Sequence, residues 1–382
     1  MNRETGTYAI STTLGESVRA FVPYALPPQE PALSPSAYEH LNHQAELALA
    51  RLVGVSGLVP SVEWLLYSAI RKEALLTSQI EGTQASLTDL FDDEAGIKVS
   101  NADDVEEVSN YLRAFRWVQA ELRDPKGLPI SVRLLCDAHR LLLNGVRGAG
   151  KQPGELRRSQ NWIGGTRPGN AVFVPPPPEK MAGLLADLER YIHGAEANLP
   201  PMVRVALIHA QFETIHPFLD GNGRIGRLLI AALFEHWGLL NEPLMYLSGF
   251  LKQHQSEYYR RLSVIRTEGD WESWVSFFLE GVTVAAGDAE QNIIKVASLI
   301  SADRKRVLQS SKTGQASYRL FELLPMMPRF TIEMVRQQLD ISFPTATAAV
   351  KSLEELGLVA EMTGQKKNRT YSYHAYVELL SG

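Results

Sequence analysis

Twelve consecutive residues, 216–227 (HPFLDGNGRIGR), combine side chains that do chemistry and that a packed core does not need. They comprise one histidine, one aspartate, three glycines, one asparagine and two arginines, beside proline and apolar residues. Apolar patterns of helical period flank the stretch at 202–215 and 228–237, so we expect a tight turn between two helices. This mixture of residue types predicts a site for an anion.

The glycine-rich part of the stretch is expected to bind phosphate. Gly221, Asn222 and Gly223 precede a helix that is predicted to begin at about Arg224. Consecutive backbone N–H groups in such a turn, together with the positive end of the helix, form a concave anion site. Arg224 and Arg227 lie one helical turn apart, and a guanidinium can fork onto phosphate oxygens.

A carboxylate and a histidine beside this turn indicate the kind of reaction. Asp220 would repel an anion unless a cation lay between them, and Mg²⁺ prefers one carboxylate together with phosphate oxygens. His216 can be neutral at pH 7 and accept a proton. Taken singly, each of these residues is more often structural, but their combination favours attack by a hydroxyl group on a nucleotide phosphate.

Residues 216–227 resemble the signature of the Fic (filamentation induced by cAMP) family, His-x-Phe-x-Asp/Glu-Gly-Asn-Gly-Arg-x-x-Arg, and meet every defining position. The resemblance covers essentially the whole chain from about residue 20. It implies a mainly α fold, a Fic-type helical bundle with a β-hairpin flap, plus a C-terminal winged-helix (α+β) domain. It also implies a protein adenylyltransferase, which transfers AMP from ATP to a Ser, Thr or Tyr hydroxyl of a target protein and releases pyrophosphate.

The resemblance assigns roles to individual residues. His216 would be the catalytic base, and Asp220 would hold Mg²⁺. The residues expected to bind the nucleotide are Gly221, Asn222, Gly223, Arg224, Ile225, Gly226 and Arg227. Strand-like pieces at 161–163 and 171–174 would form the flap that clamps the target segment by strand-like pairing. The flap residues are Ile163, Gly164, Gly165, Val172, Phe173 and Val174; a purely structural hairpin is the alternative.

A second motif, TSQIEG at 77–82, closes the helix expected at 61–80. A glutamate at a helix C-terminus is unfavourable with the helix dipole, which suggests another partner for Glu81. An exposed surface residue is the alternative. The motif resembles the family's inhibitory motif, Ser/Thr-x-x-x-Glu-Gly/Asn, which Thr77, Glu81 and Gly82 match. The resemblance implies that Glu81 pairs with Arg227 and occupies the place of the ATP γ-phosphate. The same site could also catalyse the reverse reaction, the removal of AMP from a modified target.

The chain divides into three expected parts: an N-terminal arm and helices that carry the inhibitory motif (1–95), the Fic catalytic core (96–300) and the winged-helix domain (301–382). Residues 1–35, rich in proline, serine and threonine, predict an extended arm. Further helices are expected at 36–51, 102–122, 131–143, 181–193, 256–265 and 271–301.

The C-terminal part offers a different class of function. Residues 303–374 hold eleven lysines and arginines and seven acidic residues, a net charge of +4. Lys366, Lys367 and Arg369, in the expected wing, could reach DNA phosphates. The expected recognition helix, 345–356, offers only Lys351 as a cation. The alternative is therefore a winged-helix DNA-binding transcription regulator whose Fic part senses a nucleotide; a protein-interaction or dimer module is a third interpretation.

The composition fits an ordinary globular protein. Of 382 residues, 45% are apolar and 21% are charged. The net charge of −5 argues against a protein that binds nucleic acid over its whole surface. The single cysteine, Cys136, excludes an internal disulfide framework and a cysteine-based zinc site. The N-terminus lacks a signal-peptide pattern and no stretch is apolar enough to span a membrane, so we expect a cytoplasmic protein without a membrane partner. ATP and a target protein are the expected partners, with DNA and a second copy of the chain as further candidates.

Overall fold

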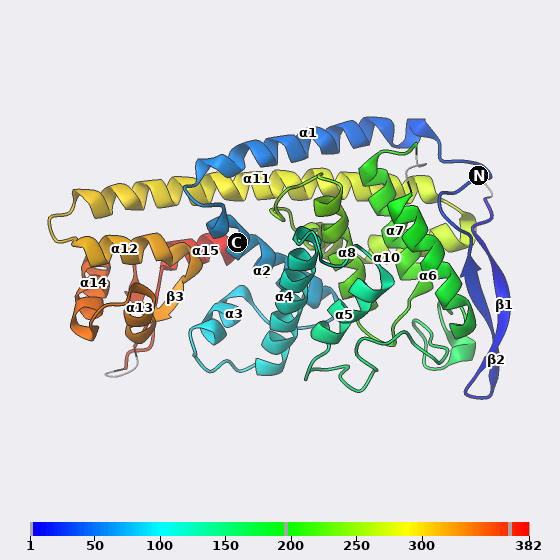
Figure 1. The fold of residues 1–382 in the computed structure, drawn as a ribbon, viewed down its shortest axis with the longest axis horizontal. Coiled ribbons are helices and arrows are strands. Elements are labelled where there is room, and N and C mark those ends of the chain that lie inside the picture. Colours follow the sequence, from blue (N-terminus) through cyan, green and yellow to red (C-terminus); the bar gives the residue numbers. More distant parts are fainter. Residues whose placement is uncertain (1–2, 195–197, 366–368, 382) are drawn as a thin grey trace.

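Two long helices lie side by side along the molecule (Figure 1). They are α1 (Glu39–Val55) and α11 (Trp271–Gln309). Contacts at both ends show that they run in the same direction, because Ser276 donates a hydrogen bond to the carbonyl of Ala37 and Arg51 pairs with Glu290. The computed structural model describes residues 3–194, 198–365 and 369–381. Helix α11 continues beyond α1 and carries the chain to the C-terminal unit.

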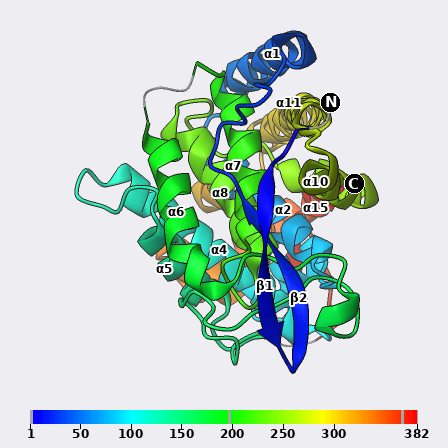
Figure 2. The same ribbon diagram turned by 90° about the vertical axis from the view of Figure 1, so that its right-hand side faces the viewer.

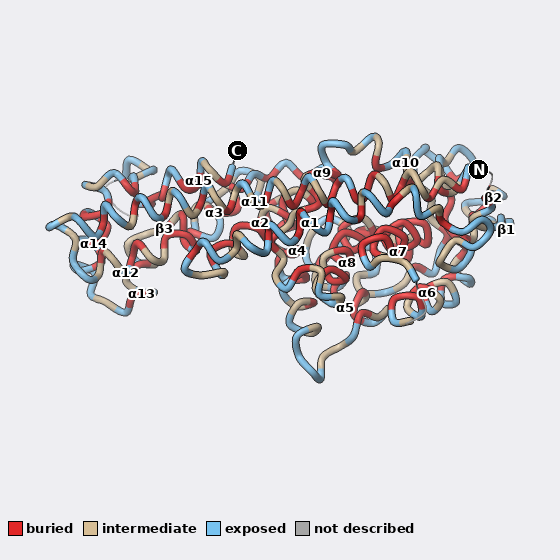
Figure 3. The backbone as a smooth tube through the Cα atoms, turned by 90° about the horizontal axis from the view of Figure 1, so that it is seen from above, coloured by how far each residue is buried: buried red, intermediate tan, exposed pale blue. Residues whose placement is uncertain are grey.

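The centre of the bundle is α7 (Pro201–Ile215), followed by α8 (Asn222–His236). From Met202 to Ile215 every residue of α7 except Arg204 is buried, polar residues such as His209 and Glu213 included. Figure 3 shows the buried backbone concentrated at these two helices. The other helices of the bundle are α2 (Val62–Ile80), α3 (Leu87–Glu94), α4 (Ala102–Arg123), α5 (Val132–Leu142), α6 (Pro178–His193), α9 (Leu247–Gln253) and α10 (Gln255–Glu268). Among the described residues, no helix has the length and apolar character that crossing a membrane requires.

The N-terminal segment is a β-hairpin, where the sequence predicted only an extended arm. Strands β1 (Gly6–Thr13) and β2 (Glu16–Pro23) pair antiparallel in continuous register. Leu14 and Gly15 both have positive φ, as in the two-residue turns that match the twist of a hairpin. The hairpin lies across one end of the helical bundle (Figure 2).

The segment predicted as the flap forms less β-structure than expected. Ile163 and Phe173 make one isolated bridge in place of two strands. Gly164 and Gly165 both have positive φ, and a short 3₁₀ turn at Pro168–Asn170 follows, so the backbone leaves the extended conformation on both sides of the bridge. The expectation of a regular hairpin was therefore wrong, although the segment does fold back on itself.

The C-terminal unit consists of a helix, a short strand, two further helices, two short strands and a last helix. Its elements are α12 (Gln315–Leu323), β3 (Arg329–Thr331), α13 (Ile332–Leu339), α14 (Phe343–Glu355), β4 (Ala360–Glu361), β5 (Thr370–Ser372) and α15 (His374–Ser381). The sheet is antiparallel in the order β3-β5-β4. Its identity as a winged helix stays a prediction, and Lys366 and Lys367 lie outside the described residues. An ion pair of Arg329 with Asp92 joins this unit to α3.

Three short helices escaped prediction: α3, α9 and α15. Helix α3 carries a sequence signal, a capping box at its N-terminus. The side chain of Ser86 accepts from the N–H of Asp89, and the side chain of Asp89 accepts from the N–H of Ser86. Helices shorter than three turns give few periods of the apolar pattern, so their signal is weak.

Candidate active site

His216 ends α7 in a left-handed conformation, with φ 51° and ψ 61°. Its N–H still donates to the carbonyl of Phe212 at 2.9 Å, which closes the last turn of the helix. A histidine with positive φ is uncommon and is retained only where the surrounding structure holds it. The left-handed residue reverses the chain so that 217–221 lead directly into α8.

Arg157 holds this reversal in place from the side of the flap. The buried guanidinium donates to the carbonyl of His216 at 2.9 Å and also to the carbonyls of Ser159 and Pro176. The backbone N–H of Arg157 donates to the carbonyl of Pro217 at 2.9 Å. One arginine thus ties the signature turn to both ends of the flap segment.

The imidazole of His216 is neutral near pH 7. Burial lowers its pKa to about 4, and the nearby cations Arg157 and Arg266 act in the same direction. Its Nδ1 atom has no hydrogen-bond partner among the described residues. Because Nδ1 is also buried, the nitrogen of the neutral imidazole that can accept a proton from a bound hydroxyl group is Nε2.

Helix α8 begins two residues before the predicted start, at Asn222, with left-handed Gly221 before it. The side-chain oxygen of Asn222 accepts from the N–H of Phe218 at 2.8 Å, and its amide donates to the carbonyl of Phe218 at 2.8 Å. The side chain therefore braces the turn instead of reaching a ligand. The first N–H groups of α8 have no acceptor within the helix, which leaves them to an anion.

Asp220 borders this helix end with a partly exposed carboxylate. Its Oδ1 atom accepts from the N–H of Gly221 at 2.6 Å and lies 3.8 Å from Arg224. In the described ranges, no group of three or more histidine, cysteine, aspartate or glutamate side chains is placed to hold a metal. Asp220 fits Mg²⁺ as a single carboxylate ligand beside nucleotide phosphates, which is the kind of site that Mg²⁺ prefers.

The end of α2 reaches the same place. Arg227, whose side chain is 2% exposed, donates to Oγ1 of Thr77 at 2.6 Å, to the carbonyl of Thr77 at 3.1 Å and to Glu81 at 2.5 Å. Burial alone would raise the pKa of Glu81, but the cation of Arg227 outweighs it and lowers that pKa. The pair is therefore ionised at neutral pH.

The Glu81 carboxylate lies against the N-terminus of α8. A Cβ built on Gly223 would come within 2.4 Å of Oε1 of Glu81, so only glycine admits the carboxylate here. Gly82 has φ 100°, and N–H groups of Gly82 and Thr83 donate to the carbonyls of Gln79 and Ser78. This is a Schellman termination, which ends α2 so that Glu81 points at α8.

Arg224 is held by a carboxylate that the sequence did not predict. Its Nη1 atom lies 3.2 Å from Oε2 of Glu107, and both side chains are buried. Arg147 pairs with the same carboxylate at 3.2 Å and donates to the carbonyl of Glu81 at 3.3 Å. Glu107 on α4 therefore links two arginines at the edge of the anion site.

Ile225 and Gly226 face the core, and their nucleotide-binding role stays a prediction. Ile225 is fully buried in the core. A Cβ on Gly226 would lie 2.3 Å from Oε1 of Glu213 and 3.2 Å from His209, so this glycine admits close packing of α8 on α7. Neighbouring helical residues point to different sides, which separates these two residues from Arg224 and Arg227.

Two family models match the chain. The model described as "Fic/DOC family N-terminal" matches residues 40–119, and the model described as "Fic/DOC family" matches residues 129–234. The chain contains both Fic/DOC family domains over these residues. Together the two matches contain both the inhibitory motif and the signature.

Curated relatives and solved structures carry Fic names as well. "Protein adenylyltransferase Fic" of Drosophila grimshawi is 30% identical over 205 residues, which cover 53% of this chain and 39% of that protein. The protein of the same name from Drosophila ananassae is 29% identical over 208 residues, 53% of this chain and 38% of that protein. The chain thus spans about two fifths of the length of these relatives.

The fold matches that of solved Fic proteins. A Fic family protein from Desulfovibrio desulfuricans G20 superposes with a TM-score of 0.58 at 22% identity, covering 89% of this chain and 96% of that one. Fic-1 (residues 134 to 508) from C. elegans gives a TM-score of 0.52 at 21% identity, covering 68% of this chain and 74% of that one. At these identities the likeness concerns the fold alone.

Four residues beside the Fic signature escaped prediction: Glu107, Arg157, His139 and Glu213. His139 accepts from the N–H of Gly154 at 2.9 Å, so its other nitrogen carries the proton and donates to the carbonyl of Asp220 at 3.0 Å. Burial raises the pKa of Glu213 to about 7. The only signal in the sequence was a charged residue at a position that the helical pattern predicts as buried, as for Glu213 in α7.

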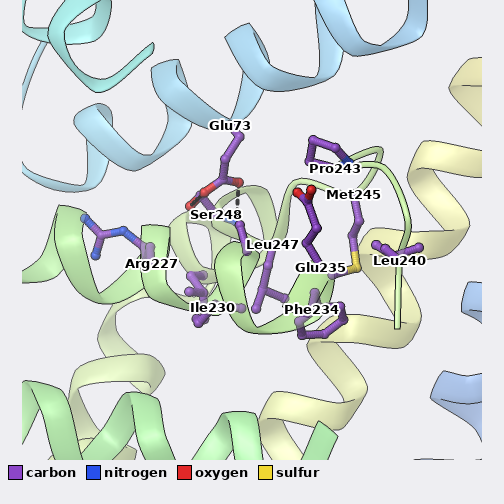
Figure 4. Close-up of a pocket in the computed structure, with 12 residues that line it drawn as sticks. Glu73, Arg227, Ile230, Phe234, Glu235, Leu240, Pro243, Met245, Leu247 and Ser248 are labelled. Carbon is purple, nitrogen blue, oxygen red and sulfur yellow. Dashed lines mark hydrogen bonds between the residues drawn. The ribbon is translucent and has the colours of Figure 1, made fainter. Parts of the chain in front are cut away.

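A small hollow lies along the other flank of α8 (Figure 4). Arg227 and Glu73 are its polar residues nearest the Fic site, and apolar side chains such as Phe234, Met245 and Leu247 form most of its wall. Glu73 is buried and accepts from the N–H and the hydroxyl of Ser248. The hollow therefore adjoins the arginine that Glu81 engages.

Proposed function

We propose that the chain transfers AMP from ATP to a Ser, Thr or Tyr hydroxyl of a target protein, and that Glu81 restrains this activity. The observation that carries the proposal is the position of the Glu81 carboxylate, which lies against Gly223 and pairs with Arg227. A carboxylate of the chain itself thus occupies an anion position at a helix N-terminus, and a phosphate would compete for the same partners. The names of the curated relatives support the reaction.

The proposed chemistry begins at His216. Its neutral imidazole accepts the proton of the target hydroxyl as that oxygen attacks the α-phosphorus of ATP. A new bond forms between oxygen and the α-phosphorus, the bond from that phosphorus to the bridging oxygen of the β-phosphate breaks, and pyrophosphate leaves. The Arg157 guanidinium, bonded to the His216 carbonyl, keeps the imidazole in position.

The phosphates would be held by the chain's own charges. N–H groups at the start of α8 would receive one phosphate, and Arg224 and Arg227 the outer phosphates. Mg²⁺, when bound by Asp220 and phosphate oxygens, would neutralise part of the negative charge. The target segment would lie along the flap, where Val172 exposes its side chain beside the bridge of Ile163 with Phe173.

The restraint follows from the partners of Arg227. While Glu81 accepts from this guanidinium, a γ-phosphate cannot use the same donor and would also meet the charge of the carboxylate. Transfer therefore requires the end of α2 to move or Glu81 to change rotamer. The same site is expected to support the reverse reaction, in which AMP is removed, when a modified target is bound.

Labelled ATP tests the proposal. The Glu81→Gly variant, incubated with ATP labelled on the α-phosphate, should transfer label to itself or to added protein, and His216→Ala in the same background should abolish transfer. A γ-phosphate label should give no labelled protein. Protein labelled from γ-ATP alone would show phosphate transfer and overturn the proposal; no label from either would exclude both reactions.

DNA binding by the C-terminal unit stays the alternative function. In α14, Lys351 is exposed beside exposed Glu354 and Glu355, and Glu355 pairs with Lys312 at 3.0 Å. This charge pattern gives little support for a helix that reads DNA. A gel shift with the chain's own upstream DNA would test it.

A further inference from the structure

Arg147 lies at the edge of the proposed phosphate site, and the proposed AMP transfer does not use it. It comes from the irregular segment between α5 and α6, not from the Fic signature. Its guanidinium contacts the Glu107 carboxylate at 3.2 Å and the Glu81 carbonyl at 3.3 Å, while more than half of its side chain remains exposed. The first contact is shared with Arg224, and the second lies at the end of the inhibitory helix.

The backbone of this segment approaches the signature closely. Gly148 has φ 90°, and a Cβ built on it would come within 2.9 Å of Oδ2 of Asp220. The residue after Arg147 is therefore in contact with the expected metal ligand. This proximity places the segment beside Asp220, within reach of the proposed phosphate site.

The charges at the site balance only while no nucleotide is bound. Three guanidinium groups face three carboxylates, so the ionised set is neutral in the state with Glu81 engaged. A nucleoside triphosphate with Mg²⁺ adds about two negative charges, and displacement of Glu81 supplies only one unit of positive charge. The set consists of Arg147, Arg224, Arg227, Glu81, Glu107 and Asp220.

We infer that Arg147 is a third phosphate-binding arginine, which contacts the outer phosphates of a nucleoside triphosphate once the end of α2 moves. This inference rests on the proposed function, because it uses the same nucleotide site. In the restrained state Glu107 and the Glu81 carbonyl hold Arg147 away from the phosphates. Movement of the end of α2 carries the Glu81 carbonyl away and so removes one of these acceptors. Arg147 then selects the triphosphate over nucleotides that lack outer phosphates.

Calorimetric titration with Mg²⁺ and ATP, ADP or AMP tests this selection. The background is the full chain with Glu81→Gly and His216→Ala, so that the site is open and the nucleotide is not consumed. Adding Arg147→Ala should weaken ATP binding about tenfold to hundredfold, the loss expected for charge-assisted hydrogen bonds, and leave AMP binding unchanged. Arg147→Lys keeps the positive charge but cannot form two parallel hydrogen bonds to a phosphate. Its affinity for ATP should lie between that of the background and that of Arg147→Ala.

Arg158→Ala is the matched control, since Arg158 is an exposed arginine of the same connecting segment that pairs with Glu155. It should leave the affinity for all three nucleotides unchanged. Equal losses for ATP and AMP in Arg147→Ala would indicate a structural role and overturn the inference, as would no loss for either. A folded background that binds no ATP, with folding checked by thermal unfolding, would instead overturn the proposed function together with this inference.

Discussion

Oε1 of Glu81 lies 2.5 Å from Nη2 of Arg227, across 146 positions of the sequence. The two side chains are unequally buried, with 32% of the glutamate and 2% of the arginine exposed. Arg227 is also bonded twice to Thr77, so two residues near the end of α2 hold this arginine. The more exposed glutamate is therefore the side from which the pair opens, and Thr77 helps to keep Arg227 in the restrained position.

Glu81→Gly should raise AMP transfer at least tenfold over the wild-type chain. The change removes the carboxylate that competes with a phosphate for Arg227 and leaves the arginine in place. Transfer from α-labelled ATP, including self-modification, measures the effect. Glu242→Gly is a matched control, because Glu242 is equally exposed at 33% and pairs with Arg123 far from the signature; its transfer should equal wild type. Wild-type activity as high as that of Glu81→Gly would exclude the restraint.

Thr77→Val should activate the chain partially. The hydroxyl of Thr77 accepts from Nε of Arg227 at 2.6 Å, and valine removes this acceptor while preserving the shape. A hydrogen bond to a charged group contributes roughly 1.5–3 kcal/mol, so Arg227 should be less firmly held and stability should fall by a similar amount. The measurements are initial rates of transfer and denaturant unfolding. Thr77→Ser should behave as wild type, and a Thr77→Val variant with unchanged rate would show that this bond takes no part in the restraint.

Glu213→Gln should stabilise the protein more at pH 8 than at pH 5. The folded state raises the pKa of Glu213 from 4.5 to about 7 by burial. Between these two pKa values the Glu213 carboxyl is protonated in the folded chain and ionised in the unfolded chain. Glu213 therefore lowers the free energy of unfolding as pH rises, by on the order of 3 kcal/mol above pH 7. Glutamine removes this ionisation.

Denaturant unfolding of wild type and Glu213→Gln at the two pH values checks this expectation. The buried histidines are present in both proteins, so their titration cancels in the difference. Equal differences at pH 5 and pH 8 would contradict the raised pKa of Glu213.

The local features of this chain were readable from the sequence, and those made by distant residues were not. The Fic signature and the helices around it depend on consecutive residues, so α2, α4, α5 and α7 lie within about three residues of their predicted ends. The contact of Arg224 with Glu107 joins positions 117 apart and leaves no periodic trace. The hairpin β1–β2 was missed for a related reason, because its buried face packs on the flap: Val18 and Ala20 form a small cluster with Val174.

The Fic signature also shows where roles assigned to residues from a motif alone differ from the structure. Asn222 matches the motif, yet its side chain is occupied with both backbone groups of Phe218. Ile225 stands at a position that the motif leaves open, and its side chain packs in the core. A motif records which residues a site needs, while only the three-dimensional arrangement separates those facing the ligand from those that support them.

AMP transfer by Glu81→Gly should remain constant between about pH 7.5 and 5.5. Burial lowers the pKa of His216 from 6.5 to about 4, so the base is neutral throughout this range, and removal of the Glu81 charge lowers that pKa further. The pH profile of kcat/KM reports the free enzyme and should decline only near pH 4. Circular dichroism at each pH shows whether the chain remains folded. A decline centred at pH 6.5 would mean that His216 titrates as an exposed histidine, and a decline near pH 7 that disappears in Glu213→Gln would assign the effect to Glu213 instead.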